Sequence, residues 1–274
     1  TIHHPITMDK RIDIKHAETL SLKLLKWRWY SFLKMQIKVA RQLDPIIVVS
    51  ENTRKDVVKD FKIDPKKTRK VLHGIDHKTF EPIPSIKRKK NQLITTASAD
   101  VPLKGLIYLI RAYSDLLNDF PDLSLIVIGK LRDGPTSKEL DKKGIKDKVK
   151  FISDLTSRQI AELYAESTIA VSPSVYEGFG FPAGEAMSCG IPLISTNGGS
   201  LPEVVGESGI IVPHSNPNEL KKAIKELLLS PEKRRELGEK GRNRVLEKFT
   251  WKRAAKELVD VYREAISNAD NRSR

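Results

Sequence analysis

Between residues 91 and 213, short apolar runs alternate with segments of helical periodicity. Each run is long enough for one buried strand, and segments 105–120 and 157–167 between them place apolar residues three and four positions apart. Parallel strands need such crossover connections, whereas antiparallel hairpins do not. The alternation therefore predicts an α/β fold with a parallel, doubly wound sheet. The predicted strands are 91–98, 123–129, 148–153, 168–173, 191–196 and 208–213.

Residues 1–76 show a similar pattern and predict part of a second unit of the same type. The expected order is a strand at 1–7, a long helix near 17–43, a strand at 44–50, a helix at 51–61 and a strand with a turn at 69–76. Residues 77–90 carry two prolines and a basic run, which indicates a linker. Because the chain begins at Thr1 inside an expected strand, we expect an upstream segment to be missing.

The charge is concentrated in the first third of the chain. The net charge is +14, and residues 1–90 carry 22 Lys and Arg against 10 Asp and Glu, while the rest carries 27 against 25. Such asymmetry favours an anionic partner or a solvated basic surface. The single cysteine excludes a disulfide framework, and no apolar run reaches the roughly 18 residues of a membrane span. With no signal-peptide pattern either, we expect a cytoplasmic protein.

Residues 23–43 mix aromatic and basic side chains without a single acidic residue. One interpretation is an interfacial helix on an anionic membrane, which would suit a lipid-linked acceptor and a peripheral location at the inner face. The other, which we favour at this point, is that the aromatics pack into the core of the N-terminal half. The aromatics do not recur as an RNA-binding motif, so no nucleic-acid partner is expected.

The stretch "VYEGFGFPAGEAMSCG" (175–190) follows a predicted strand and carries two glutamates around a glycine-rich loop. Pro182 suits the first turn of a helix, so Glu177 is expected in the loop and Glu185 on the helix. Ligands of open α/β sheets bind beyond the carboxyl ends of the strands, and a helix N-terminus favours an anion such as diphosphate. The spacing does not fit a dinucleotide-binding turn. A hydrolytic carboxylate pair and a plain turn without a ligand both stay open.

The same stretch resembles the E-x7-E signature of retaining glycosyltransferases of family 4, with Glu177 and Glu185 at the two glutamate positions. Those enzymes have the GT-B fold of two facing Rossmann-like domains. The resemblance extends to 185–205, 208–213 and 249–262, and to the segments "VSENTRKDVVKDF" and "VLHGID", where His73 stands in place of the usual asparagine.

The resemblance implies a role for several residues. Glu177 would contact hydroxyls of the donor sugar, Glu185 would hold the ribose of the nucleotide, and Lys104 would grip the diphosphate. His3 would lie near the donor sugar, with His4 as its neighbour. The remaining donor-binding candidates are Gly178, Phe179, Gly180, Gly129 and Ser98. In that family an arginine is usual about five residues before the lysine, as a second ligand of the diphosphate. Ser98 and Ala99 occupy that place here, so Lys104 is expected to contribute more of the diphosphate binding.

The sequence therefore predicts a GT-B-type α/β protein that moves a sugar from a nucleotide-diphosphate sugar to an unidentified acceptor, with retention of configuration. No Asp-x-Asp occurs, so neither a metal nor another cofactor is expected. The expected domains are a partial N-terminal one at 1–76, a donor-binding one at 91–247 and a helix at 248–274 that packs back toward the first. The alternatives are a nucleotide-sugar epimerase of the same fold, or a truncated chain that binds nucleotide sugar or membrane without turnover.

Overall fold

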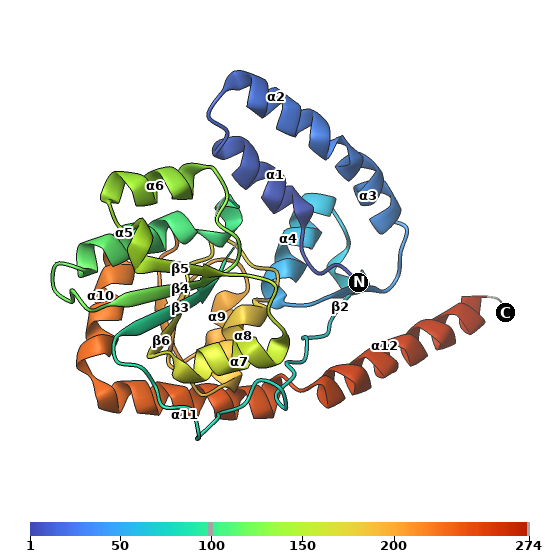
Figure 1. Ribbon diagram of the computed structural model, residues 1–274. Coiled ribbons are helices and arrows are strands. Elements are labelled where there is room, and N and C mark those ends of the chain that lie inside the picture. Colours follow the sequence, from blue (N-terminus) through green and yellow to red (C-terminus); the bar gives the residue numbers. More distant parts are fainter. Residues whose placement is uncertain (98–100, 273–274) are drawn as a thin grey trace.

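The computed structural model describes residues 1–97 and 101–272. Its larger sheet has six strands, all parallel, in the order β5-β4-β3-β6-β7-β8 (Figure 1). Every strand predicted between residues 91 and 213 contains one of these strands, which confirms the predicted α/β fold with a parallel sheet. The strands are β3 Gln92–Thr96, β4 Ser124–Ile128, β5 Val149–Ile152, β6 Ile169–Ser172, β7 Leu193–Thr196 and β8 Ile210–Val212.

Helices cover both faces of this sheet, because successive side chains of each strand point to opposite sides. Leu93 faces a core shared with α5 and α10, whereas its neighbour Ile94 faces a core shared with α7, α8 and α9. Both side chains are fully buried. The helices of this half are α5 Leu106–Leu116, α6 Pro135–Lys143, α7 Ser157–Glu166, α8 Phe181–Ser188, α9 Leu201–Val205, α10 Pro217–Leu229 and α11 Pro231–Lys248.

The strand order reverses between β3 and β6. From β3 the chain moves outward to β4 and β5, and it then returns to place β6 on the other side of β3. In open parallel sheets the connections after two such strands diverge to opposite faces, which leaves a crevice at their carboxyl ends. The loops after β3 and β6 are therefore the places to look for a ligand site.

The N-terminal half contains a second, two-stranded parallel sheet. It pairs β1 Ile46–Val48 with β2 Thr68–Lys70. Helix α4, Glu51–Phe61, starts directly after β1, where the hydroxyl of Ser50 accepts a hydrogen bond from the backbone N–H of Thr53 at 3.0 Å. Val48, Val57 and Phe61 form a small core with α3. Residues 77–90, between the two halves, contain no helix or strand.

Two predictions for the N-terminal half are wrong. Instead of a strand at 1–7, only Ile2 pairs with Val48, and Pro5 then caps α1, Ile6–Lys15. Proline cannot donate to a strand ladder, so this segment cannot continue the sheet.

The single long helix near 17–43 is also wrong, because the chain folds back on itself. Instead there are α2 Leu20–Trp29, the 3₁₀ turn η1 Tyr30–Phe32 and α3 Leu33–Ala40. Thr19 caps α2, and the hydroxyl of Tyr30 donates to Asp13 of α1 at 2.7 Å. Of the aromatics expected in a core, Tyr30 is buried, but Trp27 and Trp29 are 59% and 73% exposed.

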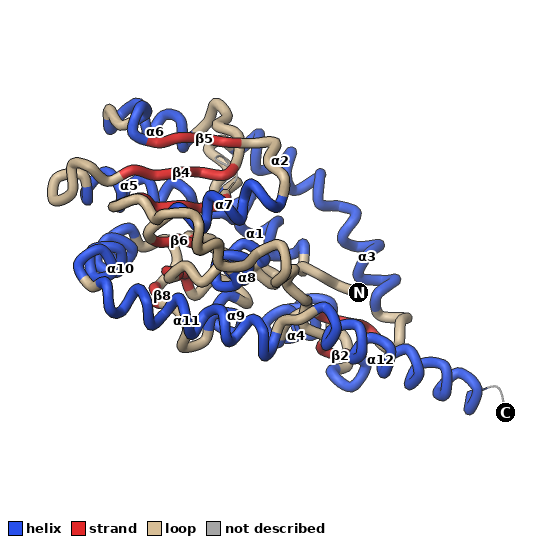
Figure 2. Tube along the Cα trace, turned by 60° about the horizontal axis from the view of Figure 1, so that its bottom comes forward, coloured by secondary structure: helices blue, strands red, loops and turns tan. Residues whose placement is uncertain are grey.

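The last helix, α12 Trp251–Arg272, lies beside β2 of the N-terminal half (Figure 2). Its Val261 packs with Ile47 and Val71, and Glu264 accepts a hydrogen bond from Arg69 at 2.9 Å. Just before the helix, Thr250 forms a β-bridge with Ile75. The chain thus crosses between its two halves twice, once through residues 71–91 and once at residue 250.

Candidate functional site

The loop at 173–180 joins β6 to α8 and is held from two sides. The backbone carbonyl of Glu177 accepts hydrogen bonds from the N–H and the hydroxyl of Ser200, at 2.9 and 3.0 Å. The next carbonyl, that of Gly178, accepts hydrogen bonds from the hydroxyls of Ser50 and Thr53, at 2.9 and 3.1 Å. Because Ser50 and Thr53 belong to the N-terminal half, this loop is fixed at the junction of the two halves.

Gly178 is needed at this junction because the first residues of the chain pass close to it. A Cβ atom on Gly178 would lie 2.2 Å from the carbonyl oxygen of His3. Any other residue would force the segment of His3 away from the loop. The structure therefore brings His3 to the glycine-rich loop.

Lys104 and Glu177 meet at the carboxyl ends of β3 and β6, where the strand order reverses. The Lys104 ammonium lies 2.7 Å from Glu177 Oε1, and the Ser174 hydroxyl donates to the same oxygen at 2.8 Å. Lys104 ends the short 3₁₀ turn η3, Pro102–Lys104. Two residues 73 positions apart in sequence thus form one polar centre with a cation and a carboxylate. Ser174 was not predicted as a site residue, although its position three residues before Glu177 places it on the same loop.

Glu185 lies on the first turns of α8 and has no polar partner in the part of the chain that the structure describes. Burial raises the pKa of its carboxyl to about 7. The hydroxyl of the fully buried Tyr164 donates to the carbonyl of Pro182 at 3.3 Å. Burial raises the pKa of Tyr164, and the nearby Glu185 charge raises it further. A carboxylate held without a partner at a raised pKa is suited to accept hydrogen bonds from a ligand.

The start of α8 offers backbone donors beside these carboxylates. Gly180, with a φ of 97°, precedes the helix, and no side chain caps it. Within residues 1–97 and 101–272, the N–H groups of Phe179, Gly180 and Phe181 donate no hydrogen bond. Uncapped N–H groups and the helix dipole favour an anion at this position.

His3 stacks on His73, with ring centroids 5.1 Å apart and an angle of 8° between the rings. Their Nδ1 and Nε2 atoms are 3.0 Å apart, so one ring must donate and the other accept. His73 also packs against Phe179, Phe181 and Trp251, and burial lowers its pKa to about 4. The position at which this sequence departs from the usual asparagine is thus the one that contacts His3.

The other candidates are less closely associated with this centre. Gly129 follows β4 and donates its N–H to the Ile152 carbonyl at 2.7 Å. His4 contacts Asp9 and the ring of Tyr176. Ser98, and with it the place of the usual arginine, lies outside the described residues. The described residues contain no group of three or more His, Cys, Asp or Glu that could hold a metal ion. None of the helices in the described parts is long and apolar enough to cross a membrane.

Comparison with known proteins decides the family. Residues 78–244 match the profile of the family described as glycosyl transferases group 1. The chain belongs to this family. Its matched region spans the sheet from β3 to β8 and includes Lys104, Glu177 and Glu185.

Among curated members of known sequence, the chain is 40% identical over 271 residues to the MMP alpha-(1->4)-mannosyltransferase of Mycolicibacterium hassiacum. That alignment covers 97% of this chain and 65% of the relative. The chain spans about half to two thirds of the length of the curated relatives it matches.

Solved structures share the fold of this group 1 family member. Sucrose-phosphate synthase from Thermosynechococcus elongatus superposes with a TM-score of 0.79 at 23% identity, over 97% of this chain and 67% of the other. Anabaena Alr3699/HepE, solved in complex with UDP-glucose, gives a TM-score of 0.75 at 18% identity, over 88% and 69% of the two chains. These neighbours confirm the predicted GT-B type of fold.

Proposed function

We propose that this chain belongs to a retaining glycosyltransferase of family 4 and holds its nucleotide-diphosphate-sugar donor at the switch point between β3 and β6. The observation that carries the proposal is the Lys104–Glu177 pair, set beside the uncapped start of α8. A family member that binds a sugar diphosphate needs a cation and N–H donors for the phosphates and a carboxylate for the hydroxyls. These groups converge here, and Glu185 lies farther along the same helix.

Each group has a role in this proposal. Glu177 binds hydroxyls of the donor sugar, and Glu185 accepts hydrogen bonds from the ribose. Gly178, Phe179 and Gly180 offer backbone N–H groups to the sugar and phosphates. In the structure Lys104 is paired with Glu177, which keeps the ammonium beside the loop before any phosphate binds. His3 lies at the sugar end of the site, positioned by its contact with His73.

The reaction breaks the bond between the anomeric carbon and a phosphate oxygen. The leaving diphosphate gains negative charge, which Lys104 and the α8 N–H groups stabilise without the help of a metal. The acceptor hydroxyl attacks from the same face, and the leaving phosphate takes its proton, so that the anomeric configuration is kept. Binding fixes the sugar in position, which supplies the remaining reduction of the barrier.

The donor sugar is proposed to be mannose, because the 40% identical relative is named a mannosyltransferase. The epimerase alternative is not favoured, because the 40% identical relative is named for the transfer of a sugar.

The test is thermal-shift binding of the chain to UDP, GDP and ADP and to their mannose and glucose conjugates. We expect the melting temperature to rise for one base and to rise further for the mannose conjugate. Glu185→Ala should abolish the rise, whereas Glu166→Ala, which removes a carboxylate from the end of α7, should keep it. A shift that is equal with both variants would contradict the assignment of the ribose to Glu185. No shift with any ligand would overturn the donor site itself.

A further inference from the structure

Helix α2 exposes apolar side chains on every side. None of its ten residues is buried. The side chains that are between 59% and 75% exposed include five large apolar ones, Leu20, Leu24, Leu25, Trp27 and Trp29. Isolated exposed hydrophobics are common, but contiguous ones mark a contact surface. Continuing through η1 and α3, this surface includes Leu20, Leu22, Leu24, Leu25, Trp27, Trp29, Phe32, Met35, Val39 and Leu43. We call it the α2–α3 surface.

The charge of the α2–α3 surface has a single sign. Between Glu18 and Asp44 the sequence contains six Lys and Arg and no Asp or Glu. Within the described chain, the side chains of Lys23, Arg28, Lys34 and Lys38 have no acidic partner. Their charges are therefore available to an external anion. A protein partner would match a surface whose polar rim carries charges of both signs. A surface whose rim is uniformly basic, as here, complements a uniformly anionic plane.

A cleft between α1 and the α2–α3 surface adds basic groups next to the aromatics. Lys10, Lys15 and Lys34 line it together with Trp27 and Tyr30. The Lys10 ammonium lies 5.8 Å from the centre of the Trp27 ring, which is a cation–π distance. An amphipathic ring beside ammonium groups is the arrangement that suits the headgroup level of a bilayer.

Figure 1 shows α2 and α3 along one outer edge of the molecule, with α1 between α2 and the rest of the chain, while α3 packs on β1 and α4. A flat surface could approach this edge without meeting the sheet of β3 to β8. We propose that the α2–α3 surface binds the molecule to anionic phospholipid bilayers, with Trp27 and Trp29 inserted at the interface and the lysines and Arg28 on the headgroup phosphates. This goes beyond the proposed function, because it does not depend on sugar transfer.

The chain contains three tryptophans, and two of them are on the α2–α3 surface. In a Trp251→Phe variant, fluorescence therefore reports on Trp27 and Trp29 alone. With vesicles of phosphatidylcholine and phosphatidylglycerol we expect a blue shift of the emission and sedimentation of the protein with the vesicles. With phosphatidylcholine alone, or in 0.5 M salt, both effects should be much weaker, because the headgroup attraction is screened.

Two variants test the apolar and the electrostatic parts separately. Trp29→Gln, and Lys23→Glu combined with Arg28→Glu, should each reduce the partition coefficient about tenfold or more. Leu229→Gln on α10, a 65% exposed leucine away from this surface, and Lys222→Glu are the matched controls and should bind as the unchanged chain does. Because all the altered side chains are exposed, the variants should keep the fold, which circular dichroism checks.

Two results would overturn the proposal. One is the absence of vesicle binding by the folded chain at low salt. The other is a dimer in sedimentation equilibrium that Trp29→Gln converts to monomer, since a second copy would then cover the surface.

Discussion

Glu185 combines a buried carboxyl with the lack of any polar partner in the described chain, and its protonation should therefore be linked to folding. Its pKa is raised from 4.5 to about 7, so the folded state keeps a proton that the unfolded state loses between these values. Stability due to this group is complete below pH 4.5 and is lost as the pH rises through 7.

Glu185→Gln should therefore stabilise the protein at pH 8 and have little effect at low pH. A shift of this size corresponds to about 3 kcal/mol as an upper limit at pH 8, and to less than about 1 kcal/mol at pH 5. Urea denaturation at the two pH values measures the difference. A gain in the free energy of unfolding that is equal at both would show that the effect comes from packing and not from the charge.

Lys104 should matter far more for turnover than for stability. Its ion pair with Glu177 leaves the lysine side chain 32% exposed, so its loss should cost no more than about 1 kcal/mol of stability. Removing an oriented donor from a developing anion costs about 3–4 kcal/mol, or a factor of roughly 10²–10³ in kcat/KM. Lys104→Ala should show this split in a transfer assay, and Lys146→Ala, which removes an exposed pair with Asp141, should not. Activity of Lys104→Ala within threefold of the unchanged enzyme would remove Lys104 from the site.

Among the elements, the short turn η3 sets the position of Lys104, and Gly105 ends it. Gly105 has a φ of 63°, and a Cβ atom there would lie 2.1 Å from the carbonyl oxygen of Pro173, on the loop that carries Glu177. Gly144 ends α6 with the same φ of 63°, but a Cβ atom there would meet nothing within 4 Å. The two glycines differ in their surroundings and not in their backbone conformation.

This difference gives a matched prediction for alanine. Gly144→Ala should lower the free energy of unfolding only by the cost of a left-handed residue, about 1–2 kcal/mol. Gly105→Ala should lower it by at least twice as much, because the clash involves backbone on both sides. It should also weaken donor binding, because it moves Lys104 away from Glu177. Equal changes in the free energy of unfolding for the two variants would mean that η3 and the loop at 173–180 are not tightly packed.

The elements also show which parts of the fold could be predicted from the sequence. Strands such as β4 and β6 are buried on both faces, so their apolar runs stand out, and a proline marks the start of α8. The break between α2 and α3 could not be predicted, because it depends on the contact of Tyr30 with Asp13 in α1. The pairs Lys104–Glu177 and His3–His73 could not be predicted either, because they too depend on contacts between residues far apart in the sequence. Their members are 73 and 70 positions apart, and only the packed sheet and loops bring them together.

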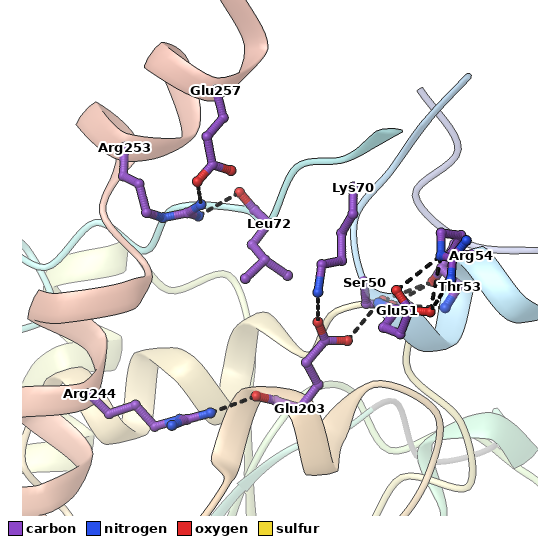
Figure 3. Close-up of polar contacts among 11 residues, drawn as sticks. Ser50, Glu51, Thr53, Arg54, Lys70, Leu72, Glu203, Arg244, Arg253 and Glu257 are labelled. Atoms are coloured by element: carbon purple, nitrogen blue, oxygen red, sulfur yellow. Dashed lines mark hydrogen bonds and ion pairs between the residues drawn. The ribbon is translucent and has the colours of Figure 1, made fainter. Parts of the chain in front are cut away.

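At the scale of the whole molecule, Glu203 on α9 links the two halves close to the candidate site. Its carboxylate accepts hydrogen bonds from the backbone N–H of Glu51 at 2.6 Å and from Lys70 at 2.9 Å (Figure 3). Arg244 of α11 donates to the backbone carbonyl of Glu203 at 2.8 Å. The carboxylate thus lies at the N-terminus of α4, where the helix dipole favours it. Arg253 of α12 adds a second link through the Leu72 carbonyl, at 2.9 Å.

Glu203→Gln should loosen this junction without unfolding the larger sheet. It removes the charge from an ion pair and from the start of α4, which together should cost about 1–2 kcal/mol. Hydrogen exchange should speed up at the Glu51 amide and along β2, because these groups lose their link to α9, while β3 and β4 should keep their rates. Glu207→Gln, at an exposed carboxylate with no hydrogen bond in the described chain, is the control. If β3 and β4 exchanged faster to the same extent, the halves would open only by global unfolding, and the loop at 173–180 would be held by the whole molecule and not by this one contact.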